Sequence, residues 1–165
     1  MERMYGVEMQ VPAGKLPGFY AQVVHKIGDN VEVFDRDQQM FIVKREAERE
    51  QLLAILGKHQ MAGELIDLWR LPEDIKDAPD SDYGFVSLSG NAYLLADLVA
   101  FFQFTQPSGS SQEQWAALQQ MKEHILLDIT SGSDSPRLYA VDRNLADLID
   151  GIARAYRVNV KWIEE

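Results

Sequence analysis

The stretch "VEVFDRDQQMFIVKREAEREQLLAILGKHQ", residues 31–60, changes its hydrophobic period halfway along. In its first half polar and apolar residues alternate, and the polar residues 36–38 interrupt the alternation as a turn does. In its second half an apolar stripe has helical spacing, and Gly57 is a plausible end for the helix. The stripe consists of Leu52, Leu53, Ile55 and Leu56. The stretch therefore predicts two antiparallel strands that lead directly into a helix.

The residues before this stretch are expected to add further strands. "MYGVEMQV" at 4–11 alternates loosely and predicts a strand, which the prolines and glycines of 12–18 then interrupt. "FYAQVVHKI" at 19–27 is rich in β-branched and aromatic residues and predicts a second strand, with a turn at 28–30. Residues 19–44 as a whole are therefore expected to form an antiparallel meander.

The middle of the chain is expected to hold two more helices. "GELIDLWRL" at 63–71 predicts a helix that Pro72 ends. After a surface loop, "YGFVSLS" at 83–89 predicts a short strand. "GNAYLLADLVAFFQF" at 90–104 is apolar almost all round, which is typical of a central buried helix.

The last third of the chain is expected to contain a helix, a hairpin, a second helix and a closing strand. Ser110 and Glu113 have the spacing of a capping box, so a helix is predicted to begin there. "ILLDIT" and "RLYAVD" predict the two strands of a hairpin, with the turn composition "SGSDSP" at 131–136 between them. An amphipathic helix is expected at 144–158 and an alternating strand at 158–163.

This order of elements favours an α+β fold. An antiparallel meander is followed by helices, a later hairpin and a helix–strand ending, without the strict strand–helix alternation of a parallel α/β sheet. The 165 residues are expected to form one domain, 1–165, and the acidic loop at 72–83 is the best candidate for an internal seam. No internal repeat is visible in the sequence.

The charge of the chain is strongly negative and unevenly spread. The net charge is −10, from 26 acidic and 16 basic residues. Residues 1–60 have a balance of −1, whereas residues 61–165 have a balance of −9. The acidic part would repel nucleic-acid phosphates, so we expect no nucleic-acid partner and favour a basic protein. An acidic surface also keeps a protein soluble, and that plain explanation stands beside the partner hypothesis.

The densest group of acidic residues predicts a partner-binding loop. Only Lys76 offsets the negative charge within this loop, and Pro72 and Pro79 limit its conformational freedom. The predicted partner-binding residues are Glu73, Asp74, Asp77, Asp80 and Asp82. A solvated surface loop without any partner would have the same composition.

A catalytic alternative lies around the predicted hairpin. His124 could meet Asp128 or Asp142 across it, and these groups could then serve a hydrolase. The sequence lacks the G-x-S-x-G elbow that presents a serine nucleophile. A polar turn explains the same residues without any chemistry.

Other kinds of site are not predicted. The chain has no cysteine, its three histidines lack the spacing of a metal site, and it contains no phosphate-binding loop. Asp80 and Asp82 resemble the start of a calcium loop, but the remaining ligand positions are missing. We therefore expect no metal, no cofactor and no membrane span, and the absence of cysteine and of a secretory signal favours a cytoplasmic protein.

Two classes of function remain open from the sequence. The first is a small acidic, non-catalytic binding protein that acts on a protein partner as an inhibitor, an immunity-type neutraliser or a chaperone-like adaptor. The second is a small enzyme, a hydrolase with a site around His124, Asp128 and Asp142.

Overall fold

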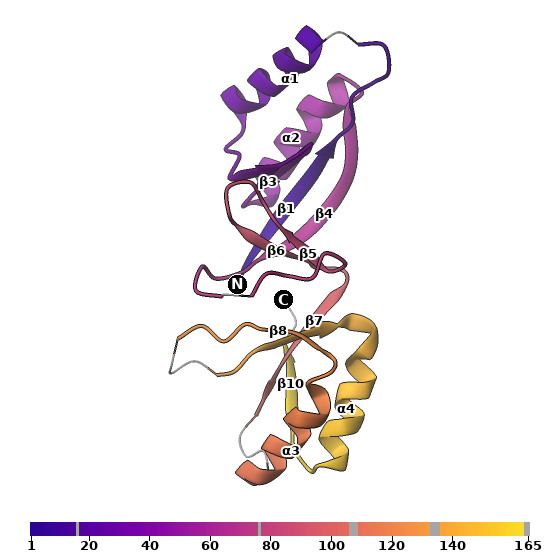
Figure 1. Cartoon of the computed structure of the whole chain (residues 1–165). Helices are drawn as coiled ribbons and strands as arrows, with labels where there is room; N and C mark the ends of the chain where they lie inside the picture. Colours follow the sequence, from indigo (N-terminus) through magenta and orange to yellow (C-terminus); the bar gives the residue numbers. More distant parts are fainter. Residues whose placement is uncertain (16, 76, 106–108, 133–135, 164–165) are drawn as a thin grey trace. The chain divides into compact units, whose positions relative to one another are not determined.

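The chain divides into two compact units, each with its own helices and antiparallel strands (Figure 1). The first unit comprises Met1–Arg70 and Val86–Tyr93, and the second comprises Leu71–Phe85 and Leu94–Glu165. The predicted seam at 72–83 belongs to the second unit. It begins just after Arg70 and Leu71, where the chain first passes from the first unit to the second. The structure, a computed structural model, describes residues 1–15, 17–75, 77–105, 109–132 and 136–163.

The first unit has the element order β-α-β-β-α-β. Its elements are β1 (Glu2–Met9), α1 (Pro17–Asn30), β2 (Asp35–Asp37), β3 (Met40–Val43), α2 (Glu46–Lys58) and β4 (Ala62–Arg70). The four strands lie in the order β2-β3-β1-β4, and each described pair is antiparallel. This connectivity, in which two strand–helix–strand passages interleave in one antiparallel sheet, is the split βαβ or ferredoxin-like motif.

Two further strands extend the first sheet beyond β4. They are β5 (Gly84–Val86) and β6 (Ala92–Leu95), and the complete order is β2-β3-β1-β4-β6-β5. The chain passes between the two units inside these strands, so that the connecting residues 86–93 belong to the first unit.

The second unit repeats the connectivity of the first. Its elements are β7 (Val99–Phe104), α3 (Ser111–Met121), β8 (Ile125–Asp128), β9 (Tyr139–Asp142), a 3₁₀ turn (Arg143–Leu145), α4 (Ala146–Ala155) and β10 (Val160–Ile163). The antiparallel strand order β10-β7-β9-β8 matches β4-β1-β3-β2 position by position. The expectation of no internal repeat is therefore wrong at the level of topology, although the two halves share no evident sequence pattern.

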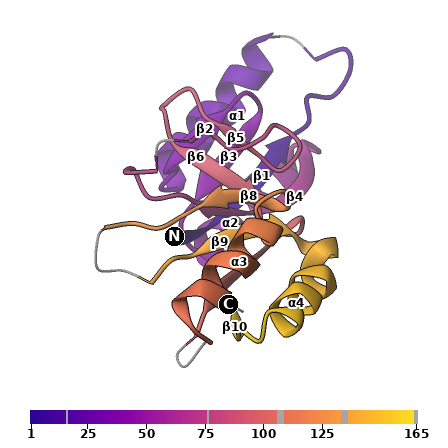
Figure 2. The same ribbon diagram turned by 60° about the horizontal axis from the view of Figure 1, so that its bottom comes forward.

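In each unit two neighbouring helices and the strands of the sheet enclose an apolar core (Figures 1 and 2). The first core includes Val7, Met9, Val23, Ile27, Leu52 and Leu56. The second core includes Phe102, Ala117, Met121, Tyr139, Val141, Ile149 and Ile152.

The second helix of each unit ends in the same way. Gln60 after α2 and Arg157 after α4 have φ angles of 56° and 57°, in the left-handed region that glycine usually occupies. The next residues, Met61 and Val158, donate their backbone N–H to the carbonyl five positions earlier, at 2.9 and 3.0 Å. This is the hydrogen bond of a Schellman cap. Its donor residues, Met61 and Val158, are buried where the chain leaves the helix for the last strand of the unit.

The predicted meander over 19–44 is wrong in its first part, because residues 19–27 lie in α1. Val23 and Ile27 are buried one helical turn apart, and three further residues with the same spacing pack against the core. These three are Phe19, Tyr20 and Val24. The β-branched residues thus favoured a strand locally, but their spacing suits a helix that covers a sheet. The strands β2 and β3 form the hairpin that remains of the meander.

The helices predicted at 63–71 and 90–104 are both strands. The first region forms β4, where the neighbouring residues Leu68 and Trp69 are both buried. The second forms β6 and β7, with the exposed Asp97 in the turn between them. Successive residues of a strand point to opposite faces, so burial of both faces gives the continuous apolar run that resembles a buried helix.

The other predicted elements are confirmed, as is the α+β class. The helix expected at 45–60 is α2, and the capping box of Ser110 and Glu113 starts α3, with the Ser110 side chain accepting the Glu113 backbone N–H. The late hairpin, the amphipathic helix at 144–158 and the closing strand are β8–β9, α4 and β10. Residues 133–135 of the predicted hairpin turn lie outside the described residues.

Candidate functional site

A cavity of about 530 Å³ in the first unit is one candidate site. It lies where the start of β1, the connection from α1 to β2, and the connection from β3 to α2 come together. Its lining residues are Glu2, Glu32, Val33, Phe34, Lys44, Arg45 and Glu48. No local sequence pattern indicates this site, because its residues come from three separate places in the chain.

Glu48 closes one end of the cavity and caps α2. Its side chain is 5% exposed, and one carboxylate oxygen accepts the backbone N–H groups of Lys44 and Arg45, each at 3.1 Å. The other oxygen accepts hydrogen bonds from the Arg45 guanidinium, with Nε at 2.8 Å. Burial opposes ionisation, but the hydrogen bonds from Arg45 hold the pKa of Glu48 below its usual value. Both oxygens are therefore engaged within the protein.

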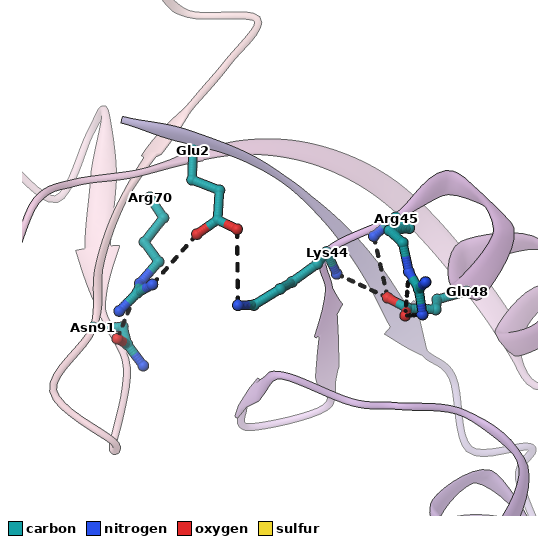
Figure 3. A network of polar contacts seen from close by, with 6 residues as sticks. All are labelled: Glu2, Lys44, Arg45, Glu48, Arg70 and Asn91. Carbon is teal, nitrogen blue, oxygen red and sulfur yellow. Dashed lines mark hydrogen bonds and ion pairs between the residues drawn. The ribbon is translucent and has the colours of Figure 1, made fainter.

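Glu2 joins two cations at the other end of the same network. Figure 3 shows Glu2 and Arg70 at one end, Arg45 and Glu48 at the other, and the Lys44 side chain extending toward Glu2. The Glu2 carboxylate lies 3.3 Å from Arg70 Nη1 and 3.8 Å from Lys44 Nζ. Lys44 Nζ and Arg70 Cζ also lie 4.5 and 4.7 Å from the centre of the Phe34 ring, at cation–π distance.

Each end of the network contains charged groups of both signs. At the Glu2 end, Lys44 and Arg70 face the Glu2 carboxylate, and Asn91 accepts from Arg70 Nε at 3.3 Å while its amide nitrogen donates to Asp35. At the Glu48 end, Arg45 faces both Glu48 and Glu32, whose carboxylate is 83% exposed and 3.5 Å from Arg45 Nη2. Cations and carboxylates thus lie next to one another at both ends of the network.

A second polar cluster in the first unit is largely buried. Asp35 is 5% exposed, and its Oδ2 accepts hydrogen bonds from Ser87 Oγ at 2.6 Å and from Asn91 Nδ2 and Tyr93 Oη at 2.8 Å. Burial raises the pKa of Asp35, but the hydrogen bonds from Ser87, Tyr93 and Asn91 outweigh it and lower the pKa to about 2. Burial and the bond to Asp35 raise the pKa of Tyr93. These hydrogen bonds join β2 to the segment from β5 to β6.

The Asp35 cluster shows that the first sheet curls. In the strand order, β2 and β6 are separated by β3, β1 and β4. A flat sheet would hold them about 19 Å apart, because neighbouring strands lie about 4.8 Å apart. The hydrogen bond between Asp35 of β2 and Tyr93 of β6 requires a strongly curved sheet.

The predicted partner-binding residues lie on the surface of the second unit. All five are exposed: Glu73, Asp74, Asp77, Asp80 and Asp82. Asp74 accepts a hydrogen bond from Ser131 Oγ at 2.8 Å. Asp80 organises a turn, because its Oδ1 accepts the Asp82 N–H and its carbonyl accepts the Tyr83 N–H, both at 2.9 Å. Lys76 lies outside the described residues.

Tyr83 connects this loop to an acidic residue 59 positions away. Its hydroxyl donates to Asp142 Oδ2 at 2.7 Å. The hydrogen bond to Asp142, burial and the charges of Asp142, Asp82 and Asp80 raise the pKa of Tyr83. The same hydrogen bond lowers the pKa of Asp142. Asp142 thus adds to the acidic surface, and no local sequence pattern indicates this.

The residues of the predicted hydrolase site are only partly brought together. Ile125 pairs with Val141, so His124 and Asp142 lie at the same end of the β8–β9 pair. Asp128 pairs with Tyr139 at the other end, and its carboxylate accepts the Thr130 N–H at 3.0 Å. Within the described ranges, no hydrogen bond or ion pair joins His124 to either carboxylate.

The acidic residues of the two units have different partners. The first unit carries 11 acidic and 9 basic residues, and ion pairs such as Arg3–Asp67 at 2.6 Å and Arg49–Asp67 at 3.3 Å join them. The second unit carries 15 acidic and 7 basic residues. Several of its carboxylates accept hydrogen bonds from neutral donors instead, such as Trp162 Nε1 to Asp150 at 3.0 Å. Neutral donors orient a carboxylate but leave its charge in place.

The described residues contain neither a metal site nor a membrane-spanning helix, and the comparisons with known proteins found no match. In the part of the chain that the structure describes, no three His, Asp or Glu side chains are grouped so as to hold a metal ion. Over the same residues, no helix is both long enough and apolar enough to cross a membrane. No protein-family model matches the chain, and the comparisons with curated proteins and with solved structures also found no match.

Proposed function

We propose that this chain is a non-catalytic binding protein that acts on a basic protein partner through an acidic surface of its second unit. The acidic surface consists of Glu73, Asp74, Asp77, Asp80, Asp82 and Asp142. The observation that carries the proposal is the separation of charge: a balance of −8 in the second unit against −2 in the first.

The hydrogen bonds of these carboxylates support the proposal. The exposed Asp74 and the half-buried Asp142 accept from the hydroxyls of Ser131 and Tyr83, which leave the negative charge of both carboxylates in place. Such charges act over about 8 Å at physiological salt and draw a basic partner into encounter. An inhibitor, an immunity-type neutraliser and a chaperone-like adaptor would all gain speed of capture from this attraction.

The same hydrogen bonds limit the entropy that binding would cost. The turn at Asp80 fixes the backbone up to Gly84, and the bond from Tyr83 to Asp142 ties this turn to the end of β9. A surface whose charged groups are already positioned loses less freedom when a partner docks.

The decisive experiment compares two triple variants with the same change in charge. The partner is first captured with the full chain and identified by mass spectrometry. Association is then measured for the variant Asp77→Asn, Asp80→Asn and Asp82→Asn. We expect association to slow about tenfold at low salt, with a weaker salt dependence and a smaller change in dissociation.

The matched control removes three exposed acidic groups from the first unit, by Asp29→Asn, Glu50→Gln and Glu64→Gln. It should associate almost as fast as the unaltered protein. Equal rates for the two triple variants would mean that total charge matters and the acidic surface does not. Hydrolysis of a substrate that is lost in His124→Ala would replace the proposal with the hydrolase alternative.

A further inference from the structure

We infer that the cavity of the first unit binds a small zwitterion of the amino-acid type, a molecule that carries one ammonium and one carboxylate group. The inference concerns a different unit from the acidic surface and does not depend on the proposed partner. It follows from the lining groups that remain available once the internal hydrogen bonds have been assigned.

The available cationic group is the ammonium of Lys44. Its closest carboxylate oxygen, on Glu2, is 3.8 Å away, which is beyond hydrogen-bonding distance, and its side chain is about half exposed. The ammonium rests against the Phe34 ring and has three N–H donors. Lys44 can therefore donate to a carboxylate of a ligand in the cavity.

The available anionic group is the carboxylate of Glu32. Both oxygens of Glu48 are engaged with Arg45 and with backbone N–H groups, so Glu48 has little left to offer a ligand. Glu32 is 83% exposed and has one ion pair, at 3.5 Å from Arg45. It can therefore accept hydrogen bonds from an ammonium group.

The presence of available groups of both signs favours a ligand that also carries both. Three cations and three carboxylates form the network: Lys44, Arg45, Arg70, Glu2, Glu32 and Glu48. An anionic ligand would be attracted by Lys44 but repelled by the nearby carboxylates. A cationic ligand would be attracted by Glu32 but repelled by the nearby cations. A zwitterion can offer its carboxylate to Lys44 and its ammonium group to Glu32.

The size and composition of the cavity fit such a ligand. Its volume of about 530 Å³ lies within the range of about 300–1,000 Å³ typical of small-molecule sites. Val33 and Phe34 add apolar surface between the charged groups, which suits an aliphatic side chain. The probes are therefore L-leucine and the dipeptide Leu-Leu.

The first test compares ligands on the unaltered full chain. L-leucine and Leu-Leu are titrated while the backbone amides are followed by NMR, with N-acetyl-L-leucine and L-leucinamide as controls that lack one charge each. We expect saturable shifts at Val33, Phe34 and Lys44 with a zwitterion, and about tenfold weaker binding of each control. The inference is overturned if neither zwitterion gives saturable shifts there, or if a singly charged control binds as tightly.

The second test assigns each charge to its residue. Lys44→Gln should remove the advantage of L-leucine over L-leucinamide, and Glu32→Gln should remove its advantage over N-acetyl-L-leucine. The matched controls, Lys58→Gln and Glu64→Gln, alter exposed residues outside the cavity and should retain both preferences. The amide spectrum of each variant shows whether it is folded. Uniform weakening of all ligands in folded Lys44→Gln and Glu32→Gln would count against the inference.

Discussion

The two units of this protein have the same topology but different surfaces. Both follow the order β-α-β-β-α-β. When the four core strands of each unit are numbered along the chain, they lie in the order 4-1-3-2 in both. Both units also end the second helix in the same cap. The shared features depend on apolar positions and backbone geometry. Because the sequences differ otherwise, the comparison separates what the topology requires from what each unit is free to vary.

Charge is the property that varies most. In the first unit Asp67 is shared between Arg3 and Arg49, which links β1, β4 and α2. In the second unit Asp142 and Asp150 are held by Tyr83 and Trp162, which add no positive charge. The same fold thus tolerates either arrangement, and the excess negative charge of the second unit is not a requirement of the topology.

The sheets also differ at the edge formed by their last strand. In the first unit β6 and β5 continue the sheet beyond β4, whereas β10 is the last strand in the order of the second sheet. The exposed Lys161 lies on β10. A lysine on an edge strand discourages uncontrolled pairing with other chains.

The largest expected effect comes from equivalent core positions. Leu52 of α2 and Ile149 of α4 are fully buried, and each lies one turn before the carbonyl that accepts the cap hydrogen bond. Leu52→Ala and Ile149→Ala should each lower the free energy of unfolding by about 2–5 kcal/mol. Denaturant unfolding combined with hydrogen exchange measures the loss in each unit.

The exposed positions Ala54→Ser and Ala155→Ser are the controls, and each should change stability by less than about 0.5 kcal/mol. A large loss for one core variant and almost none for the other would mean that the two helices do not play equivalent roles.

A smaller loss of stability is expected from a change at Asp35, the buried carboxylate of the first unit. Asp35→Asn should cost about 2–3 kcal/mol at neutral pH, since an amide cannot accept all the hydrogen bonds of the carboxylate. Asp37→Asn, on the same strand, is the control. Equilibrium unfolding in urea measures both.

The pH dependence of stability tests the same residue. The pKa of Asp35 is about 2 in the folded protein and about 3.9 in an unfolded chain. Its contribution is therefore present above about pH 4 and is lost as the pH falls toward 2. Asp35→Asn should lack this part of the acid destabilisation, and an unchanged acid profile would show that Asp35 does not provide it.

The smallest expected effect concerns the shared helix cap. Gln60→Gly and Arg157→Gly should each stabilise the protein by about 0.5–1 kcal/mol, because glycine adopts a positive φ without the steric cost of a side chain. Ala54→Gly, at an exposed position inside α2, should instead cost about 1 kcal/mol. Thermal unfolding resolves the difference, and a gain at one cap alone would indicate that the two caps are not energetically equivalent.

The sequence by itself determined the elements that have one exposed face. The apolar stripe of α2, the amphipathic pattern of α4 and the capping box of Ser110 each carry a local signal, because a side facing water must be polar. The exposure of the acidic loop follows from the same rule. The helical spacing of Val23 and Ile27 was also present in the sequence, although their β-branched side chains favoured a strand.

Only the tertiary structure decided the elements that are buried on both faces and the sites built from distant residues. In β6 and β7 the polar face that reveals a period is missing, so helix and strand leave the same apolar run. The bond from Tyr83 to Asp142 and the cavity around Lys44 join segments that only chain folding brings together. Hydrophobic periodicity records whether each residue faces water, but it does not record which residue lies across from it.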